Sequence, residues 1–145
     1  MIESILVALD GSPVARRVLD AALEVADRFD AKLTLYRAVV VPPDFAAAAY
    51  NPTGDPLPTL LHQRAAEELR ALAQGHPRAL ASAPVVTDGQ PWRAICQAAE
   101  DLGVDLIVIG SHGYAGWDRL LGTTAQHVVN HSTRSVLVVH SKDDA

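Results

Sequence analysis

The sequence contains few aromatic residues and a single cysteine. Aromatic side chains account for 5% of the 145 residues, whereas hydrophobic residues together account for 49%. Ala, Val, Leu and Ile must therefore build the core, a composition that suits helices packed on a buried parallel sheet. The length fits one domain, which we place at residues 1–145. The single cysteine excludes an intrachain disulfide.

Long apolar runs and clusters of basic residues are also missing. No apolar run approaches the roughly 20 residues that a membrane-spanning helix needs, and Met1 leads directly into a strand-like segment. We therefore expect a cytoplasmic protein that does not interact with membranes. The net charge is −5, and no run of Lys and Arg offers a broad phosphate-binding surface. We expect no nucleic-acid binding, although backbone N–H groups can still bind a small anion.

Continuous apolar runs alternate with segments of helical periodicity. The pattern predicts strands at 5–9, 32–41, 84–87, 105–109 and 135–140, and helices at 13–29, 59–74, 91–102 and 123–131. Ser12 is a suitable N-cap residue for the first helix, and Pro13 a suitable first helical residue. The intervening stretch 44–58 carries Pro and Gly and is predicted to be a surface loop.

This alternation predicts an α/β fold, a doubly wound five-stranded parallel sheet of Rossmann-like type with helices on both faces. The most plausible strand order is 3-2-1-4-5. That order reverses between the first and fourth strands, and ligands of such sheets bind beyond the carboxyl ends of the strands at this switch point. Here those ends are the segments 10–12 and 110–113.

A glycine-bearing segment follows the fourth predicted strand. Gly110 and Gly113 lie just past the strand, where the absence of a side chain lets backbone approach a ligand. Gly122 then begins a helix whose free N–H groups favour an anion, and the hydroxyls of Thr123 and Thr124 can donate to phosphate oxygens. A tight strand-to-helix connection is the simpler interpretation, but the location at the switch point favours anion binding.

The same segment lacks the lysine of a Walker A loop and the spacing of a dinucleotide-binding glycine fingerprint. Without a lysine, it can hold phosphates but supplies little charge compensation to a transition state. The pattern therefore favours nucleotide binding over fast hydrolysis, and we assign no catalytic residue.

Several motifs, in the right order along nearly the whole chain, resemble the universal stress protein family. Ile5–Ser12 is similar to the family's first strand and turn, Gly89–Pro91 to the segment before its third helix, and Asp105–Gly113 to its fourth strand and glycine loop. Gly122–Ala125 and Ser135–Val139 are similar to its ending. The resemblance implies an adenine nucleotide alpha hydrolase-like fold, a stress-response role and ATP as the ligand.

The ATP-binding members of that family carry the pattern G-x2-G-x9-G-[ST]. Gly110 and Gly113 match its first two glycines, and Gly122 followed by Thr123 matches its end. Eight residues, rather than nine, separate Gly113 from Gly122. The resemblance also implies that Asp10 contacts the nucleoside, either at a ribose hydroxyl or, through a metal such as Mg²⁺, at the phosphates. The alternative for Asp10 is a turn residue that bonds nearby backbone.

Further contacts follow from the same resemblance. Ala38 and Val39 match positions that line the adenine pocket, with ordinary sheet core as their alternative, and Ile109 would line the same pocket. His112 lies in the glycine loop and is equally consistent with phosphate contact and with solvation. The full set of predicted nucleotide contacts is Ala8, Asp10, Ala38, Val39, Ile109, Gly110, His112, Gly113, Gly122, Thr123 and Thr124.

Two histidines and the cysteine are left out of this set. His127 and His131 are four residues apart on one predicted helix, a spacing that can chelate a metal. No carboxylate or cysteine pattern completes a site, so we favour solvated or capping histidines and predict no metal site. Cys96 lies on an apolar helix face and is predicted to be core.

The last predicted strand lies at an edge of the sheet and lacks the charges and prolines that usually protect an edge. Antiparallel pairing with a second copy would cover it and give a closed twofold dimer. The resemblance implies the same, since family members form dimers through the last strand. We therefore expect a homodimer through Val136, Leu137, Val138 and Val139.

Three functions remain open at this point. The leading hypothesis is a regulatory ATP-binding protein, in which the nucleotide sets the shape of the loops at 42–57 and 111–121 and thereby the choice of partner. The second is a slow ATPase that uses Mg²⁺ and either Asp10 or His112 to position water. The third is a nucleotide-free interaction dimer, which the shortened glycine loop favours.

Overall fold

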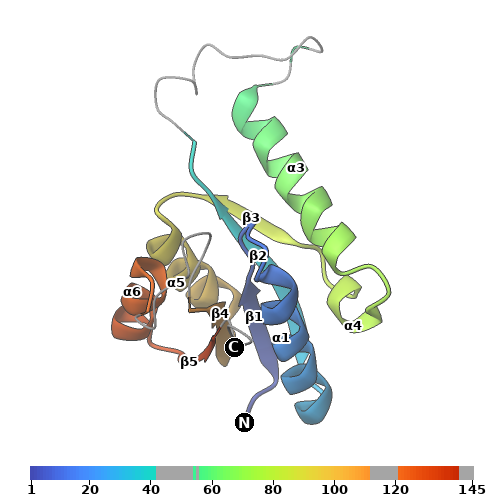
Figure 1. Cartoon of the computed structure of the whole chain (residues 1–145), viewed down its shortest axis with the longest axis vertical. Helices are drawn as coiled ribbons and strands as arrows, with labels where there is room; N and C mark the ends of the chain where they lie inside the picture. Colours follow the sequence, from blue (N-terminus) through green and yellow to red (C-terminus); the bar gives the residue numbers. More distant parts are fainter. Residues whose placement is uncertain (42–53, 55, 112–120, 141–145) are drawn as a thin grey trace.

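The computed structural model describes residues 1–41, 54, 56–111 and 121–140 (Figure 1). Within these residues, five parallel strands form one sheet in the order β3-β2-β1-β4-β5, which confirms the predicted fold class and strand order. Along the chain the elements are β1 (Ser4–Ala8), α1 (Ala15–Phe29), β2 (Lys32–Val39), α3 (Leu57–Leu72), α4 (Pro77–Leu80), β3 (Val85–Asp88), α5 (Pro91–Leu102), β4 (Leu106–Gly110), α6 (Thr123–His131) and β5 (Ser135–Val139).

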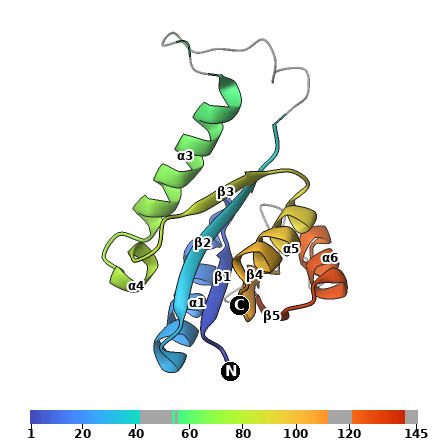
Figure 2. The ribbon, with the colours of Figure 1, turned by 180° about the vertical axis from the view of Figure 1, so that it is seen from behind.

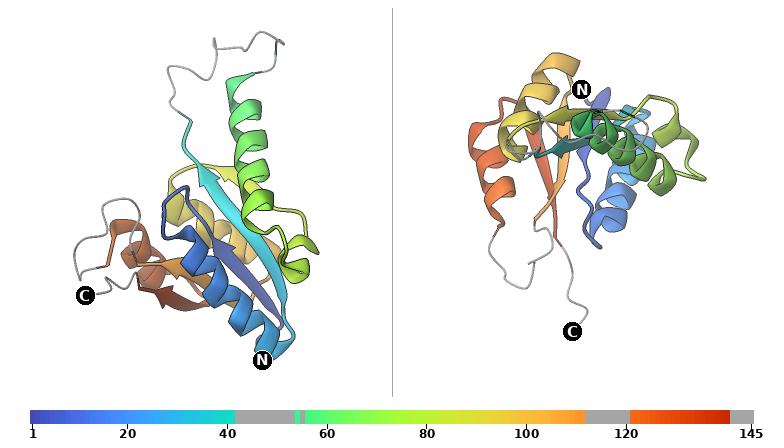
Figure 3. Two further views of the ribbon diagram at one scale, coloured as in Figure 1. Left: turned by 45° about the vertical axis from the view of Figure 1, so that its right-hand side comes forward. Right: turned by 90° about the horizontal axis from the view of Figure 1, so that it is seen from above.

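The helices cover both faces of the sheet (Figures 1 and 2). One hydrophobic cluster joins α1, α3 and α4 to alternate residues of β1, β2 and β4, whereas the other joins α5 and α6 to the residues between them. Strand alternation explains the division, since Ile5 and Val7 point to the first cluster and Leu6 to the second. The view from above in Figure 3 separates the two layers.

Several predicted boundaries are wrong by one or two residues. β1 lies one residue earlier than predicted, β2 and β5 end earlier, β3 and β4 lie one residue later, and α3 lies two residues earlier. Helix α3 therefore begins within the predicted loop, most of which lies outside the described residues. The one-turn helix α4 was not predicted, because four residues are too short to show a helical period.

The predicted N-cap of α1 is also wrong. Helix α1 begins at Ala15, two residues later than predicted, and its N-cap is Val14, which makes no side-chain cap hydrogen bond. The Ser12 N–H instead donates to Asp10 Oδ1 at 3.0 Å. This bond closes a turn between Asp10 and Ser12. The turn lengthens the connection between β1 and α1, so α1 begins only at Ala15.

Asp105 joins the start of β4 to the start of β1. Its Oδ2 accepts hydrogen bonds from the N–H groups of Glu3 at 2.8 Å and Ser4 at 3.1 Å, and its own N–H donates to the Ser4 carbonyl at 2.8 Å. The two backbone donors favour the ionised form and lower the pKa of the Asp105 carboxyl below its ordinary value. The carboxylate therefore stabilises the fold more than the neutral acid does.

We expect Asp105→Asn to change how stability depends on pH. Because the folded pKa is lower than the unfolded value near 3.9, the contribution of Asp105 is complete above about pH 5 and is lost as the pH falls through the folded pKa. The variant should be less stable than the wild type at pH 7, and the difference should shrink on acidification. Urea unfolding between pH 2.5 and 7 measures this, with Asp20→Asn, at an exposed position on α1, as control. An equal difference at every pH would contradict the prediction.

No helix in the described parts of the chain is long and apolar enough to cross a membrane.

Candidate functional site

A cavity of about 250 Å³ lies at the carboxyl ends of β1, β2 and β4, where the strand order reverses. It is bounded by the first turns of α1, α5 and α6. The residues that line it are Ala8, Leu9, Asp10, Val14, Ala15, Val18, Arg37, Ala38, Pro91, Ile95, Ile109, Gly110, Ser111, Gly122, Thr123, Thr124 and Ala125. This is the ligand-binding position of a doubly wound sheet.

Small and aliphatic side chains make one part of the cavity apolar. Ala8, Ala38 and Ile109 contribute from three neighbouring strands, and Ile95 contributes from α5. Ile95 and Ile109 belong to the core cluster on the α5 and α6 face, and the partly buried Ala8 and Ala38 pack against it. The alanines keep this space open, because any larger side chain on either strand would fill it. A flat apolar ring is the kind of group that such a pocket accepts.

Asp10 supplies an acidic group beside this pocket. It lies just past the end of β1, and its side chain is exposed. Oδ1 accepts the Ser12 N–H, so the turn that was considered as an alternative does form. Within the described residues, Oδ2 accepts no hydrogen bond. One carboxylate oxygen therefore holds the turn, and the other can accept a hydroxyl hydrogen from a ligand.

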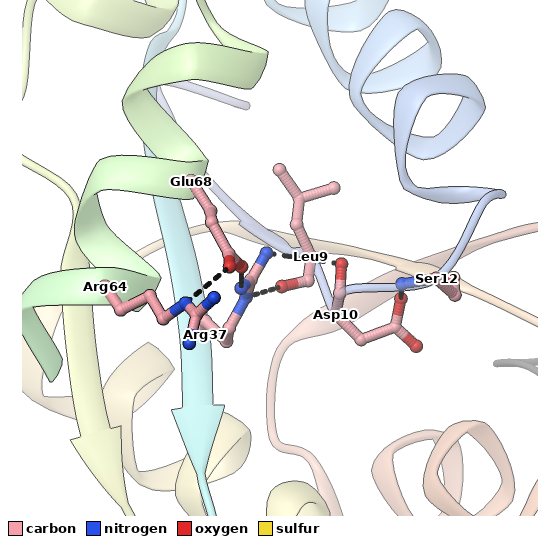
Figure 4. A network of polar contacts seen from close by, with 6 residues as sticks. All are labelled: Leu9, Asp10, Ser12, Arg37, Arg64 and Glu68. Carbon is pink, nitrogen blue, oxygen red and sulfur yellow. Dashed lines mark hydrogen bonds and ion pairs between the residues drawn. The ribbon is translucent and has the colours of Figure 1, made fainter. Parts of the chain in front are cut away.

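Arg37, which lines the cavity from β2, was not predicted. Nε donates to the Leu9 carbonyl at 2.9 Å, and a second guanidinium nitrogen donates to Glu68 of α3 at 2.5 Å (Figure 4). The third nitrogen lies 3.4 Å from the Asp10 carbonyl. The Arg37 side chain is only 13% exposed. The signal in the sequence was a charged residue in the interior of a predicted strand, between Tyr36 and Ala38.

The N-terminus of α6 forms the opposite wall. Gly122 is its N-cap, and no side chain caps the first turn. The first hydrogen bond runs from Gln126 N–H to the Gly122 carbonyl, so the N–H groups of Thr123, Thr124 and Ala125 have no acceptor within the helix. With the helix dipole, these groups favour an anion, and both threonines add hydroxyls.

Backbone hydrogen bonds hold that helix start beside the strands. The Gly122 N–H donates to the Ser111 carbonyl at 2.7 Å, and the Ser111 N–H donates to the Val139 carbonyl at 2.9 Å. Ser111 is 1% exposed. These bonds fix the first turn of α6 relative to the ends of β4 and β5, so the N–H groups of that turn are held in place without a ligand.

Most of the predicted contact residues meet at this cavity. Val39 does not line it among the described residues. His112 and Gly113 lie outside the described residues. The predicted residues that line the cavity are Ala8, Asp10, Ala38, Ile109, Gly110, Gly122, Thr123 and Thr124.

The two histidines of α6 pack against an aromatic ring. The Trp92 ring stacks on His127 and His131, with centroids 5.1 and 4.7 Å away. His127 Nδ1 also lies 2.7 Å from the Thr123 carbonyl. No group of three or more metal-ligating side chains occurs in the described parts of the chain. Cys96 of α5 packs against the core cluster on the α5 and α6 face but is only partly buried. This burial raises the pKa of its thiol.

Comparison with known proteins gives consistent matches along the chain. The model of the Universal stress protein family matches residues 1–140. Universal stress protein A homolog 1 of Coxiella burnetii is 32% identical over 141 residues, which cover 96% of this chain and 96% of that protein. Universal stress protein UspA from Lactobacillus plantarum aligns with a TM-score of 0.67 at 28% identity, covering 95% of this chain and 97% of that one. A universal stress protein in complex with cAMP aligns with a TM-score of 0.64 at 26% identity, covering 97% and 98%.

Proposed function

The chain belongs to the universal stress protein family, and from this premise we propose that it is a stress-response protein that binds an adenine nucleotide, with ATP as the leading ligand. The observation that carries the proposal is the cavity itself. It joins an apolar pocket to the uncapped N-terminus of α6 at the switch point of the sheet. A nucleotide has a flat aromatic base with apolar faces at one end and anionic phosphate at the other, so it suits both parts.

Each part of the cavity suits one part of the nucleotide. The adenine ring would lie among Ala8, Ala38 and Ile109. The ribose hydroxyls would donate to Asp10. The phosphates would accept hydrogen bonds from the first N–H groups of α6 and from the Thr123 hydroxyl. The alternative for Asp10 is contact with the phosphates through Mg²⁺, since a carboxylate is a ligand of the type that Mg²⁺ prefers.

We propose a regulatory binding role rather than an enzymatic one. No lysine lines the cavity in the described residues, and Arg37 is already bonded to Glu68 and to backbone carbonyls. Phosphoryl transfer depends on positive charge directed at the phosphates, and this cavity offers little of it. A steady release of phosphate that Asp10→Ala abolishes would favour the slow ATPase instead.

Cyclic AMP is the second candidate ligand. A universal stress protein at 26% identity is in complex with cAMP. This ligand has the same base but only one phosphate, which bridges O5′ and O3′ of the ribose, so it needs fewer phosphate contacts and keeps only the 2′-hydroxyl. The interval between Gly113 and Gly122, one residue shorter than in the ATP-binding pattern, is therefore compatible with it.

A homodimer through β5 remains part of the proposal. β5 is at the edge of the sheet in the described residues, and its side chains from Val136 to Val139 are only partly buried. Pairing with a second copy would bury them further and satisfy the free edge of the strand. A cytoplasmic location likewise remains a prediction.

Calorimetric titration of nucleotide-stripped protein tests the proposed function. ATP with Mg²⁺ should bind, AMP more weakly, and GTP hardly at all, with cAMP titrated in parallel. Replacing Thr123 and Thr124 together by Val keeps their shape but removes the hydroxyls. Since a hydrogen bond to a charged group contributes about 1.5–3 kcal/mol, the ATP affinity should fall at least tenfold, and the AMP affinity by less.

Thr59→Val is the matched control, because Thr59 is an exposed threonine on α3 that does not line the cavity. It should bind ATP as the wild type does. If the wild-type protein binds no adenine nucleotide by heat or by thermal stabilisation, the proposed function is wrong and the nucleotide-free dimer takes its place. Tighter binding of cAMP than of ATP would select the second ligand.

A further inference from the structure

We propose that Arg37 is a positioning residue, which together with Glu68 fixes the direction of the Asp10 carboxylate and so lets the site recognise a ribose. The part concerning ribose depends on the proposed function. The part concerning the turn does not, and it can be tested without any nucleotide. Figure 4 shows the residues involved.

The guanidinium of Arg37 reaches both peptide groups that flank the Asp10 Cα atom. Nε donates to the Leu9 carbonyl at 2.9 Å, and one terminal nitrogen lies 3.4 Å from the Asp10 carbonyl. Peptide groups are planar, so two carbonyls directed at one rigid guanidinium restrict the dihedral angles of the residue between them. The direction of the Asp10 side chain is thereby restricted as well.

The Arg37 side chain is itself held in place. Arg37 Nη1 donates a hydrogen bond to Glu68 Oε2 at 2.5 Å. Arg64 Nε lies 3.7 Å from the other carboxylate oxygen of Glu68. Glu68 precedes Leu69, which is fully buried and anchors α3 to the sheet. A chain of contacts thus runs from α3 through β2 to the turn after β1.

Burial argues that these contacts have a structural effect. The Arg37 side chain is 13% exposed, so the guanidinium has lost most of its water. A charge in that position is costly unless hydrogen bonds replace the hydration. The carbonyls of the turn supply two of those acceptors. Removing the Arg37 guanidinium should take these donors away from the Leu9 and Asp10 carbonyls and free the turn to move.

The consequence for recognition follows from the two oxygens of Asp10. Oδ1 is committed to the Ser12 N–H, and Oδ2 accepts no hydrogen bond within the described residues. A ribose has two neighbouring hydroxyl donors, and a fixed carboxylate oxygen can favour it over a 2′-deoxyribose. A carboxylate that rotates freely can also bond a ribose hydroxyl, but it discriminates less between ribose and 2′-deoxyribose.

Amide hydrogen exchange in the nucleotide-free protein tests the turn directly. We expect the Ser12 N–H to exchange at least tenfold faster in Arg37→Met, to exchange moderately faster in Glu68→Gln, and to be only partly restored in Arg37→Lys, because lysine cannot bridge both carbonyls. Arg28→Met is the control, since it breaks an exposed ion pair with Glu24 on α1. Unchanged exchange at Ser12 in Arg37→Met would overturn the proposal.

Nucleotide discrimination tests the role in recognition. The ratio of ATP to 2′-deoxy-ATP affinity should fall towards one in Arg37→Met and in Asp10→Asn, and the double variant should lose no more than either alone. If Arg37 had a purely structural role, its loss would lower the affinities for both nucleotides equally and leave their ratio unchanged. That result would overturn the proposal. If the wild type binds neither nucleotide, the proposed function and the ribose part fail together, while Ser12 exchange still decides whether Arg37 holds the turn.

Discussion

Ala38→Phe should abolish adenine-nucleotide binding while leaving the fold intact. Ala38 lies on β2 and lines the cavity beside Ala8 and Ile109. A phenyl ring at this position would occupy the space that is proposed for the base. Because the side chain would enter an open cavity rather than a filled core, the usual overpacking cost of about 1–3 kcal/mol should be largely avoided.

We expect the ATP dissociation constant to rise at least a hundredfold, which corresponds to about 2.7 kcal/mol, and the melting temperature to change by only a few degrees. Calorimetric titration and thermal unfolding measure the two quantities. Ala71→Phe, which introduces the same ring at an exposed position of α3, should bind ATP normally. Wild-type affinity in Ala38→Phe would show that the base binds elsewhere.

Leu69→Ala should cause the largest loss of stability that a single substitution in α3 can produce. The buried residues of α3 are Ala65 and Leu69, and Leu69 is fully buried against the sheet. Figure 1 shows the N-terminal part of α3 extending beyond the sheet, where it has little to pack against. Leu69 therefore provides most of the apolar anchorage of this helix.

Removing a buried leucine side chain typically costs about 3 kcal/mol, from the lost burial and the cavity left behind. Urea unfolding should show a loss of that size, and amide exchange should show α3 opening before the strands. Leu102→Ala, at a leucine that is 43% exposed, is the control and should lose less than about 1 kcal/mol. If Leu69→Ala lost no more unfolding free energy than Leu102→Ala, contacts other than those of Leu69 would hold α3 on the sheet.

Leu69→Ala also bears on the link from α3 to the site. Glu68 adjoins Leu69 and holds Arg37, so a helix that detaches from the sheet should release the same contacts as Arg37→Met. The Ser12 N–H should then exchange faster in Leu69→Ala as well. Faster exchange in α3 without any change at Ser12 would separate the helix from the turn.

The sequence by itself was sufficient to predict the strand order, the location of the cavity and eight of the 17 described residues that line it. Runs such as 5–9 and 106–109 are apolar at every position, as expected of a strand buried on both faces. The alternation of strand and helix then leaves few topologies, since crossovers have one hand and ligands bind at the switch point. The pattern therefore places Asp10 and Gly110 at the ends of two strands and Thr123 at the start of a helix at the same edge, whereas the role of Asp10 came from the family resemblance.

Only the tertiary structure decided which other side chains reach the same cavity. Arg37 and Glu68 are 31 residues apart, and nothing local to either one indicates that they meet. That Val39 does not line the cavity also emerged only from the structure. The late start of α1, by contrast, goes with a local bond from Ser12 to Asp10, the turn that the sequence had offered as the alternative for Asp10. Periodicity reports which face of an element is buried, whereas hydrogen bonds between distant elements depend on how those elements pack. This is why the position of the site could be predicted from the sequence, and the contacts that hold Asp10 in it could not.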